Sequence, residues 1–186
     1  MHDNRTKSIL ESLQQGQISV DDALLQLKLE PFQDLGYAKV DHHRRLRQGV
    51  PEVIYGAGKT PEQMVGIVSA MEEAGQETVL ITRLSPEAAE IVGRTHPLTY
   101  HEMGRIATVG PLPEPDGLGT IVIATGGTSD VPVAEEAAVT AQALGNRVRR
   151  LYDVGVAGVH RLLANLEYIM DASVIIAISG MEGDLA

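Results

Sequence analysis

The sequence contains three glycine-containing loops whose residue types suit an anionic ligand, and the strongest covers residues 124–132. This loop follows an apolar stretch and leads into a helical pattern. Glycine there allows a ligand to approach the backbone closely, and the start of a helix favours an anion. We predict that Gly126, Thr128, Ser129 and Asp130 bind a ligand, with Ser129 donating to a phosphate and Asp130 either capping the helix or binding a ribose. The alternative is a capped turn that binds nothing.

The second loop, residues 180–184, carries one glutamate between glycines. Glycines on either side would bring the Glu182 carboxylate up to a bound substrate, where a partly desolvated carboxylate can act as a base. We therefore predict Glu182 as the catalytic residue, with Gly180 and Met181 lining the same substrate site. The alternative is a surface turn that carries an ordinary acid.

The third loop, residues 153–161, joins a predicted strand to a predicted helix. Gly155 and Gly158 would keep this turn tight, and Arg161 could reach an anion. We predict Asp153 and Arg161 as ligand-binding residues.

Residues 56–60, Gly-Ala-Gly-Lys-Thr, resemble a phosphate-binding loop. A Walker A motif requires glycine at position 53, where the sequence has Val53, so this is not a P-loop. Lys59 remains a candidate for a second phosphate of the ligand.

A basic run near residue 44 stands out in an otherwise acidic chain. Adjacent His42 and His43 would point apart on a helix or strand, so we predict no metal site. Arg44 and its arginine neighbours either form a solvated face or clamp a phosphate bidentately. Both interpretations stay open, and Arg44 is kept as a candidate phosphate ligand.

Composition limits the classes of function. The chain has 186 residues and a formal net charge of −10, which repels nucleic acid and anionic membranes, so we expect neither as a partner. It has no cysteine, which excludes a thiolate nucleophile or thiolate metal site within these residues. The first residues lack the apolar core of a signal peptide, and the longest apolar run is too short to span a bilayer. These features predict a cytoplasmic protein.

Alternating strand and helix patterns predict an α/β fold with four parts along the chain. We expect a helical hairpin at residues 1–34, an N-terminal α/β domain at 35–110, a proline-rich linker at 111–118, and a second α/β domain at 119–186. Three prolines at alternate positions exclude helix and central strand from the linker.

Both α/β domains are expected to contain parallel sheets. In the first, strands at residues 52–55, 78–82 and 105–109 alternate with two helices, and this β-α-β-α-β order predicts right-handed crossovers. The second reads as a Rossmann-like three-layer sandwich. Its three predicted strands make a thin sheet, so we expect more chain or a partner subunit to complete it.

Several stretches together resemble one family, LarB, the pyridinium-3,5-biscarboxylic acid mononucleotide synthases. The matching stretches are residues 35–44, 51–60, 129–137, 152–161 and 180–183. The resemblance covers about residues 35–186. The part after Pro115 resembles the aminoimidazole ribonucleotide carboxylase (PurE-like) fold, whose Ser-Asp phosphate loop corresponds to Ser129 and Asp130.

The resemblance implies carboxylation of the pyridinium ring of nicotinic acid adenine dinucleotide at C5 by CO2 or bicarbonate. Hydrolysis of the phosphoanhydride then releases AMP, in the first step of nickel-pincer cofactor biosynthesis. The family uses a cysteine that adds to the ring, and Glu182 stands where its base is expected. The resemblance implies no required cofactor, with Mg²⁺ left open, and it implies a homo-oligomer.

The sequence departs from the family at its end. Family members continue past the Gly-Met-Glu-Gly loop with further strands, a lysine and the cysteine, whereas this chain ends at Ala186 without any cysteine. We expect it to be truncated and to bind nucleotide without carboxylating it. The alternatives are an aminoimidazole ribonucleotide carboxylase or mutase, and a non-catalytic nucleotide-binding fragment.

Overall fold

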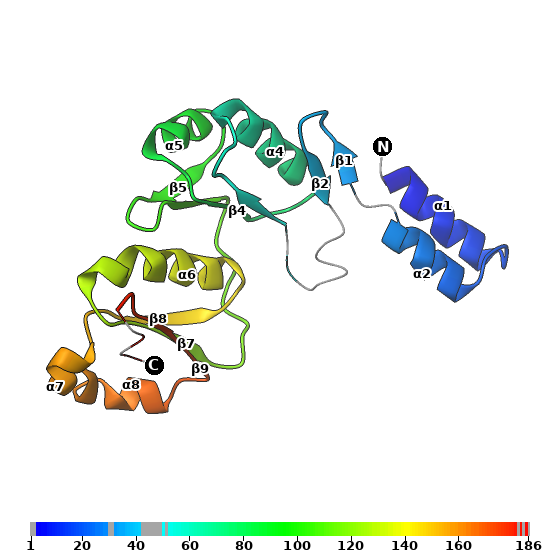
Figure 1. The fold of residues 1–186 in the computed structure, drawn as a ribbon. Coiled ribbons are helices and arrows are strands. Elements are labelled where there is room, and N and C mark those ends of the chain that lie inside the picture. Colours follow the sequence, from blue (N-terminus) through cyan, green and yellow to red (C-terminus); the bar gives the residue numbers. More distant parts are fainter. Residues whose placement is uncertain are drawn as a thin grey trace. The chain divides into compact units, whose positions relative to one another are not determined.

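The computed structural model describes residues 3–29, 32–41, 50, 52–181, 183 and 185. The chain divides into two compact units, Met1–Glu52 and Val53–Ala186 (Figure 1). Within the described ranges, no helix is long and apolar enough to cross a membrane.

The first unit begins with the predicted helical hairpin, α1 (Asp3–Gln14) and α2 (Val20–Leu29). Ser19 caps α2, since its hydroxyl accepts a hydrogen bond from the amide of Asp22 at 3.0 Å. The antiparallel pair that follows, β1 (Phe32–Asp34) with β2 (Lys39–Asp41), was not predicted. Each of these strands has only three residues, and that is too short for an alternation of polar and apolar side chains to be recognised in the sequence.

The second unit contains a four-stranded sheet in the order β3-β4-β6-β5. Its elements are β3 (Val53–Tyr55), α4 (Pro61–Glu73), β4 (Val79–Thr82), α5 (Pro86–Gly93), β5 (Leu98–His101) and β6 (Ile106–Val109). Thr60 forms a capping box at the start of α4, and Ser85 caps α5. The helix face expected to be buried, Met64, Ile67, Val68 and Met71, is buried.

The prediction of an all-parallel sheet was wrong for this part of the chain. β3 and β4 are parallel, but β6 runs antiparallel to both β4 and β5. Only residues 102–105 join β5 to β6, and a parallel crossover needs a dozen residues or more. The short connection therefore forces a hairpin. Its first strand, β5, is too short to be predicted from the sequence pattern.

The second sheet is parallel throughout, in the order β8-β7-β9, and the predicted α/β class is confirmed. Its elements are β7 (Thr120–Thr125), α6 (Val131–Ala143), β8 (Arg147–Leu151), α7 (Val159–Leu163), α8 (Leu166–Met170) and β9 (Val174–Ile178). Ile123 packs with α6, while Val122 and Ala124 pack toward residues of α7 and α8. This alternation along β7 makes three layers, with helices on both faces of the sheet.

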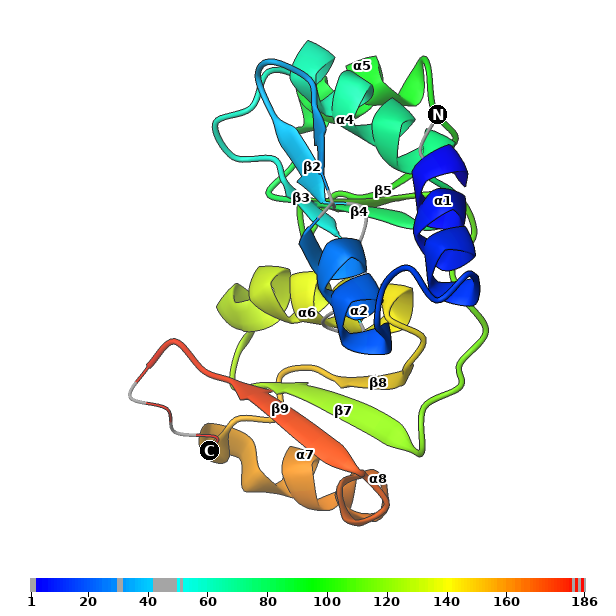
Figure 2. The same ribbon diagram turned by 90° about the vertical axis from the view of Figure 1, so that its right-hand side faces the viewer.

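Helix α6 packs against both sheets of the second unit (Figure 2). Ala134 and Ala138 pack on Ile123 of β7, whereas Val139 and Ala143 pack on Leu80 of β4 and Ile106 of β6. The hydrophobic cores of the two predicted α/β domains therefore both include residues of α6.

Enlarging a side chain on α6 tests this shared core. Ala138 is fully buried, so Ala138→Leu should lower the free energy of unfolding by about 1–3 kcal/mol through overpacking. Val133 on the same helix is 53% exposed, and Val133→Leu should change it by less than about 0.5 kcal/mol. Urea unfolding followed by circular dichroism measures both. Equal stability of the two variants would contradict the packing.

Candidate active site

The loops that follow β7, β8 and β9 meet at the carboxyl end of the parallel sheet, and we call this edge the rim. In parallel sheets this edge is where ligands bind, because helix starts and loop amides gather there. Thr125 ends β7 fully buried, and its hydroxyl accepts a hydrogen bond from the amide of Asp153 at 3.0 Å. Thr125 thus joins the loop after β8 to the central strand.

Asp130 joins the loop after β7 to the loop after β9. One carboxylate oxygen accepts from the amide of Gly127 at 2.9 Å, and the other accepts from the amide of Gly180 at 3.0 Å. Asp130 stands at the N-cap position of α6 without a side-chain bond to that helix, and its carboxylate instead caps the preceding turn at Gly127. Two loops fifty residues apart are therefore held together by one carboxylate.

Asp153 and Arg161 form an ion pair at the rim. Asp153 has a left-handed backbone with φ of 57°, which is uncommon outside glycine. The pair holds the Arg161 guanidinium beside the loop after β8, with 38% of its side chain exposed. Arg161 is thus already matched by a carboxylate, and an incoming anion would have to share it.

Gly155 lies directly against Gly126, the first residue after β7. The amide of Gly155 donates to the carbonyl of Gly126 at 3.0 Å. A Cβ atom at position 155 would overlap that carbonyl oxygen, so only glycine allows the two loops to come this close.

The rim brings together most of the residues predicted to bind substrate. Those with described positions there are Gly126, Thr128, Ser129, Asp130, Asp153, Arg161, Gly180 and Met181. The side chains of Thr128 and Ser129 are exposed, and within the described part of the chain neither hydroxyl has a hydrogen-bond partner. Both are therefore open to a ligand.

Of the predicted residues that the structure describes, Lys59 does not join this group. Glu182 and Arg44 lie outside the described residues. Lys59 follows β3, in the other sheet, where its ammonium donates to the carbonyl of Tyr55 at 2.9 Å. Its role as a phosphate ligand stays a prediction.

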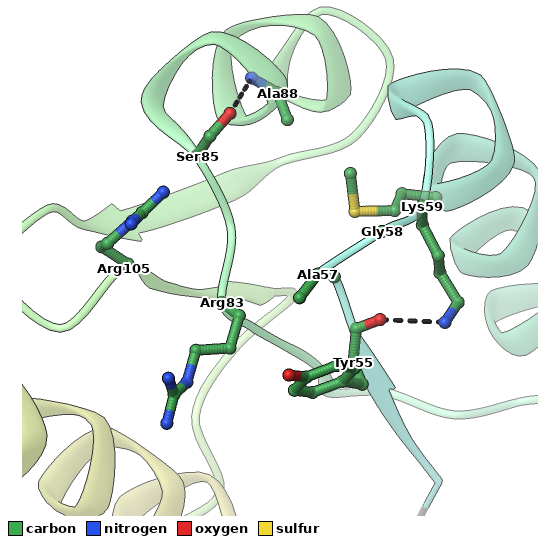
Figure 3. A pocket seen from close by; sticks show the side chains of 10 residues that line it. Tyr55, Ala57, Gly58, Lys59, Arg83, Ser85, Ala88 and Arg105 are labelled. Carbon is green, nitrogen blue, oxygen red and sulfur yellow. Dashed lines mark hydrogen bonds between the residues drawn. The ribbon is translucent and has the colours of Figure 1, made fainter.

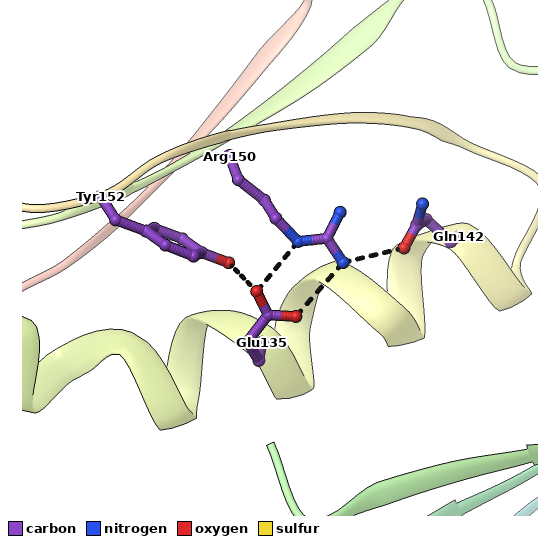
Figure 4. Close-up of polar contacts among 4 residues, drawn as sticks. All are labelled: Glu135, Gln142, Arg150 and Tyr152. Atoms are coloured by element: carbon purple, nitrogen blue, oxygen red, sulfur yellow. Dashed lines mark hydrogen bonds and ion pairs between the residues drawn. The ribbon is translucent and has the colours of Figure 1, made fainter. Parts of the chain in front are cut away.

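A polar network on α6 supports the strand that leads into Asp153 (Figure 4). Glu135 accepts from the hydroxyl of Tyr152 at 2.6 Å and from the guanidinium of Arg150 at 3.0 and 3.3 Å. Arg150 also donates to Gln142 at 3.0 Å. Burial and the Glu135 charge together raise the pKa of Tyr152, which keeps its hydroxyl protonated as a donor.

Sequence reasoning missed Thr125 and the Glu135 network. The signal for Thr125 was its place at the end of an apolar strand, directly before two glycines. Glu135, Arg150 and Tyr152 are distant in sequence, and no spacing rule links a helix residue to a strand residue fifteen positions later.

Two comparisons relate the chain to known proteins. Residues 32–111 match the family model described as LarB/PurE-like N-terminal domain. The chain is also 32% identical over 188 residues to an uncharacterized protein, MJ0165, of Methanocaldococcus jannaschii. That similarity covers 96% of this chain and 73% of the relative, so it extends beyond residue 111 into the rim loops.

Replacing Gly155 tests the close approach of the rim loops. Gly155→Ala should lower the free energy of unfolding by about 1–3 kcal/mol, because its methyl group has to displace the Gly126 carbonyl. A Cβ at Gly93, at the end of α5, would meet nothing within 4 Å, so Gly93→Ala should leave stability unchanged or slightly raised. Urea unfolding compares the two, and a neutral Gly155→Ala would show that the loops are further apart.

The Glu135 network predicts a pH-dependent contribution to stability. Burial alone would raise the pKa of Glu135, but hydrogen bonds from Tyr152 and Arg150 outweigh it and lower the pKa below its ordinary value of 4.5. A carboxyl with a lowered folded-state pKa stabilises the fold above the unfolded pKa, and this is lost as pH falls through the folded value.

We therefore expect Glu135→Gln to lower the free energy of unfolding by about 1–3 kcal/mol at neutral pH. The difference from the unmodified chain should shrink as the pH falls below about 4.5. Exposed Glu90 offers a control, and Glu90→Gln should change little at either pH. Urea unfolding at neutral and acid pH measures this; a difference that persists undiminished in acid would contradict it.

Proposed function

The chain belongs to the LarB family, and we propose that its rim binds nicotinic acid adenine dinucleotide as the substrate of pyridinium carboxylation. Membership supports a carboxylase-type role. The finer reaction proposed is addition of CO2 or bicarbonate at C5 of the ring and release of AMP from the phosphoanhydride. The product is pyridinium-3,5-biscarboxylic acid mononucleotide.

The observation that carries this proposal is the double hydrogen bond of Asp130. It brings the loop after β7 against the loop after β9, so Ser129 and Gly180 belong to one rim. The contact of Gly155 with Gly126 adds the loop after β8. A dinucleotide needs several donors at one place, and three loops at one sheet edge supply them.

We assign separate roles to the rim residues. The exposed hydroxyls of Thr128 and Ser129 donate to phosphate oxygens, and the Arg161–Asp153 pair meets the charged or ribose part of the ligand. Glu182 is proposed as the base that removes the C5 proton, from its sequence position between Met181 and Gly183. An electron-poor pyridinium must first gain electron density from a nucleophile. These 186 residues contain no cysteine for that step.

Titration of the purified chain with three ligands tests the proposal. Isothermal titration calorimetry, with and without Mg²⁺, should show binding of nicotinic acid adenine dinucleotide and none of aminoimidazole ribonucleotide. Ser129→Ala should weaken dinucleotide binding about tenfold, because a hydrogen bond to a charged phosphate is lost. Ser173 precedes β9 at the opposite end of the sheet, so Ser173→Ala is the matched control and should bind normally.

Other outcomes separate the alternatives. Binding of aminoimidazole ribonucleotide in place of the dinucleotide would favour a carboxylase or mutase acting on that substrate. AMP binding alone would favour a non-catalytic nucleotide-binding role. With labelled bicarbonate we expect no product from these 186 residues. Formation of the biscarboxylate mononucleotide would contradict the need for a cysteine.

A further inference from the structure

A pocket of about 410 Å³ lies in the β3-β4-β6-β5 sheet, where β3 and β4 end (Figure 3). Three cationic side chains line it, with Lys59 on one side and Arg83 and Arg105 on the other. The remaining lining residues are Tyr55, Gly56, Ala57, Gly58, Met64, Ser85 and Ala88. The pocket therefore combines positive charge with an apolar wall, in a chain whose net charge is −10.

Arg83 follows β4 and Arg105 precedes β6, so both arginines lie at the same end of neighbouring strands, although their side chains point in different directions (Figure 3). The β4–β6 pairing ends with Ile81 opposite Ala107, two residues before Arg83 and two residues after Arg105. The amide of Leu84 donates a hydrogen bond to the carbonyl of Arg105 at 2.7 Å, which joins the segment after β4 to the segment before β6. Cationic side chains that line one pocket repel one another, and an anion bound in the pocket would offset that repulsion.

Both arginines also have left-handed backbones, with φ of 54° at Arg83 and 47° at Arg105. This conformation is uncommon for residues with a Cβ atom, and glycine or asparagine would adopt it more readily. Strained residues gather at functional sites, where the side chain is needed despite the strain. The strain at both positions therefore points to a role for these side chains.

The present partners of the cations leave Arg105 available. Arg83 is paired with Glu136 of α6 at 3.1 Å, and Lys59 is bonded to the Tyr55 carbonyl. The guanidinium of Arg105 has no hydrogen bond or ion pair in the part of the chain that the structure describes. Glu87 is close enough for the Arg105 charge to contribute to its lowered pKa, after hydrogen bonds with its own backbone and with Ser85.

The helix starts beside the pocket do not account for it by themselves. Proline begins both α4 and α5, and the Thr60 and Ser85 side chains already cap the amides of Gln63 and Ala88. Few amides remain to bind an anion, so the side-chain cations are the main donors.

We propose that this pocket is a second anion site, which takes the phosphoryl group of a small phosphorylated ligand. Arg105 is the principal ligand, and Arg83 and Lys59 complete a cationic lining that suits a phosphate dianion. The ring of Tyr55, 57% exposed, offers a flat face to the organic part of the ligand. This site does not depend on the function proposed for the rim.

Titration with pyrophosphate, inorganic phosphate and AMP, followed by amide signals in ¹H–¹⁵N spectra, tests the site. Pyrophosphate should shift the signals of Gly56, Gly58 and Ser85. Arg105→Asn should weaken this binding at least about tenfold without loss of thermal stability, because asparagine tolerates a positive φ. Arg94, exposed at the end of α5, provides a matched control of equal charge, and Arg94→Asn should bind normally.

The outcomes distinguish this site from the rim and identify the source of the phosphate. Ser129→Ala should leave the pyrophosphate-induced shifts at Gly56 and Ser85 unchanged, whatever its effect at the rim. If AMP binds more tightly than phosphate, and this binding is lost in Tyr55→Ala, the ligand of the pocket is a nucleotide. If AMP and phosphate bind with equal affinity, the pocket recognises the phosphoryl group alone. Absence of shifts at these amides, or equal weakening by Arg94→Asn and Arg105→Asn, would overturn the proposal.

Discussion

Helix α6 has to fit between two sheets, and its small side chains make this possible. Ala134 and Ala138 are fully buried against β7, and Val139 and Ala143 are buried against β4 and β6. Larger side chains on both faces would hold the sheets apart and leave voids elsewhere. The arrangement of the second unit, Val53–Ala186, therefore depends on an alanine-rich helix with two apolar faces.

Two adjacent glutamates on this helix serve the two sheets separately. Glu135 bonds Arg150 and Tyr152 of the rim sheet, while Glu136 pairs with Arg83 at the end of β4. Neighbouring residues on a helix point about 100° apart, so two successive carboxylates can reach different layers. Through Glu135, α6 thus supports the strand that leads into the rim. Through Glu136, it holds Arg83 beside the cationic pocket. The Glu135 network is the stronger of the two, because its carboxylate accepts from both Tyr152 and Arg150, whereas a single pair with a mostly exposed arginine, such as Arg83–Glu136, contributes about 0–1 kcal/mol.

The rim is held by backbone contacts more than by side-chain packing. The Asp130 carboxylate bonds two loop amides, and Gly155 and Gly126 are bonded main chain to main chain. Such contacts fix the loops without filling the space above them. The hydroxyls of Thr128 and Ser129 are consequently left exposed at the edge where a ligand is expected.

The sequence by itself determined the local elements and the residue types of the rim. The buried face of α4, the capped starts of α4 and α5 and the parallel sheet around β7 follow from periodicity and capping, which are local properties. The placement of Asp130 and Gly180 on one rim was also predictable, because strand ends of a parallel sheet share an edge.

Only the tertiary structure decided what depends on long-range pairing. The antiparallel direction of β6, the shared packing of α6, the role of Asp130 as a bridge between loops and the gathering of Arg83 and Arg105 around one pocket all join residues distant in the chain. Short strands such as Leu98–His101 carry too weak a local pattern to be seen, and strand direction is set by the length of the connection and by packing against neighbours.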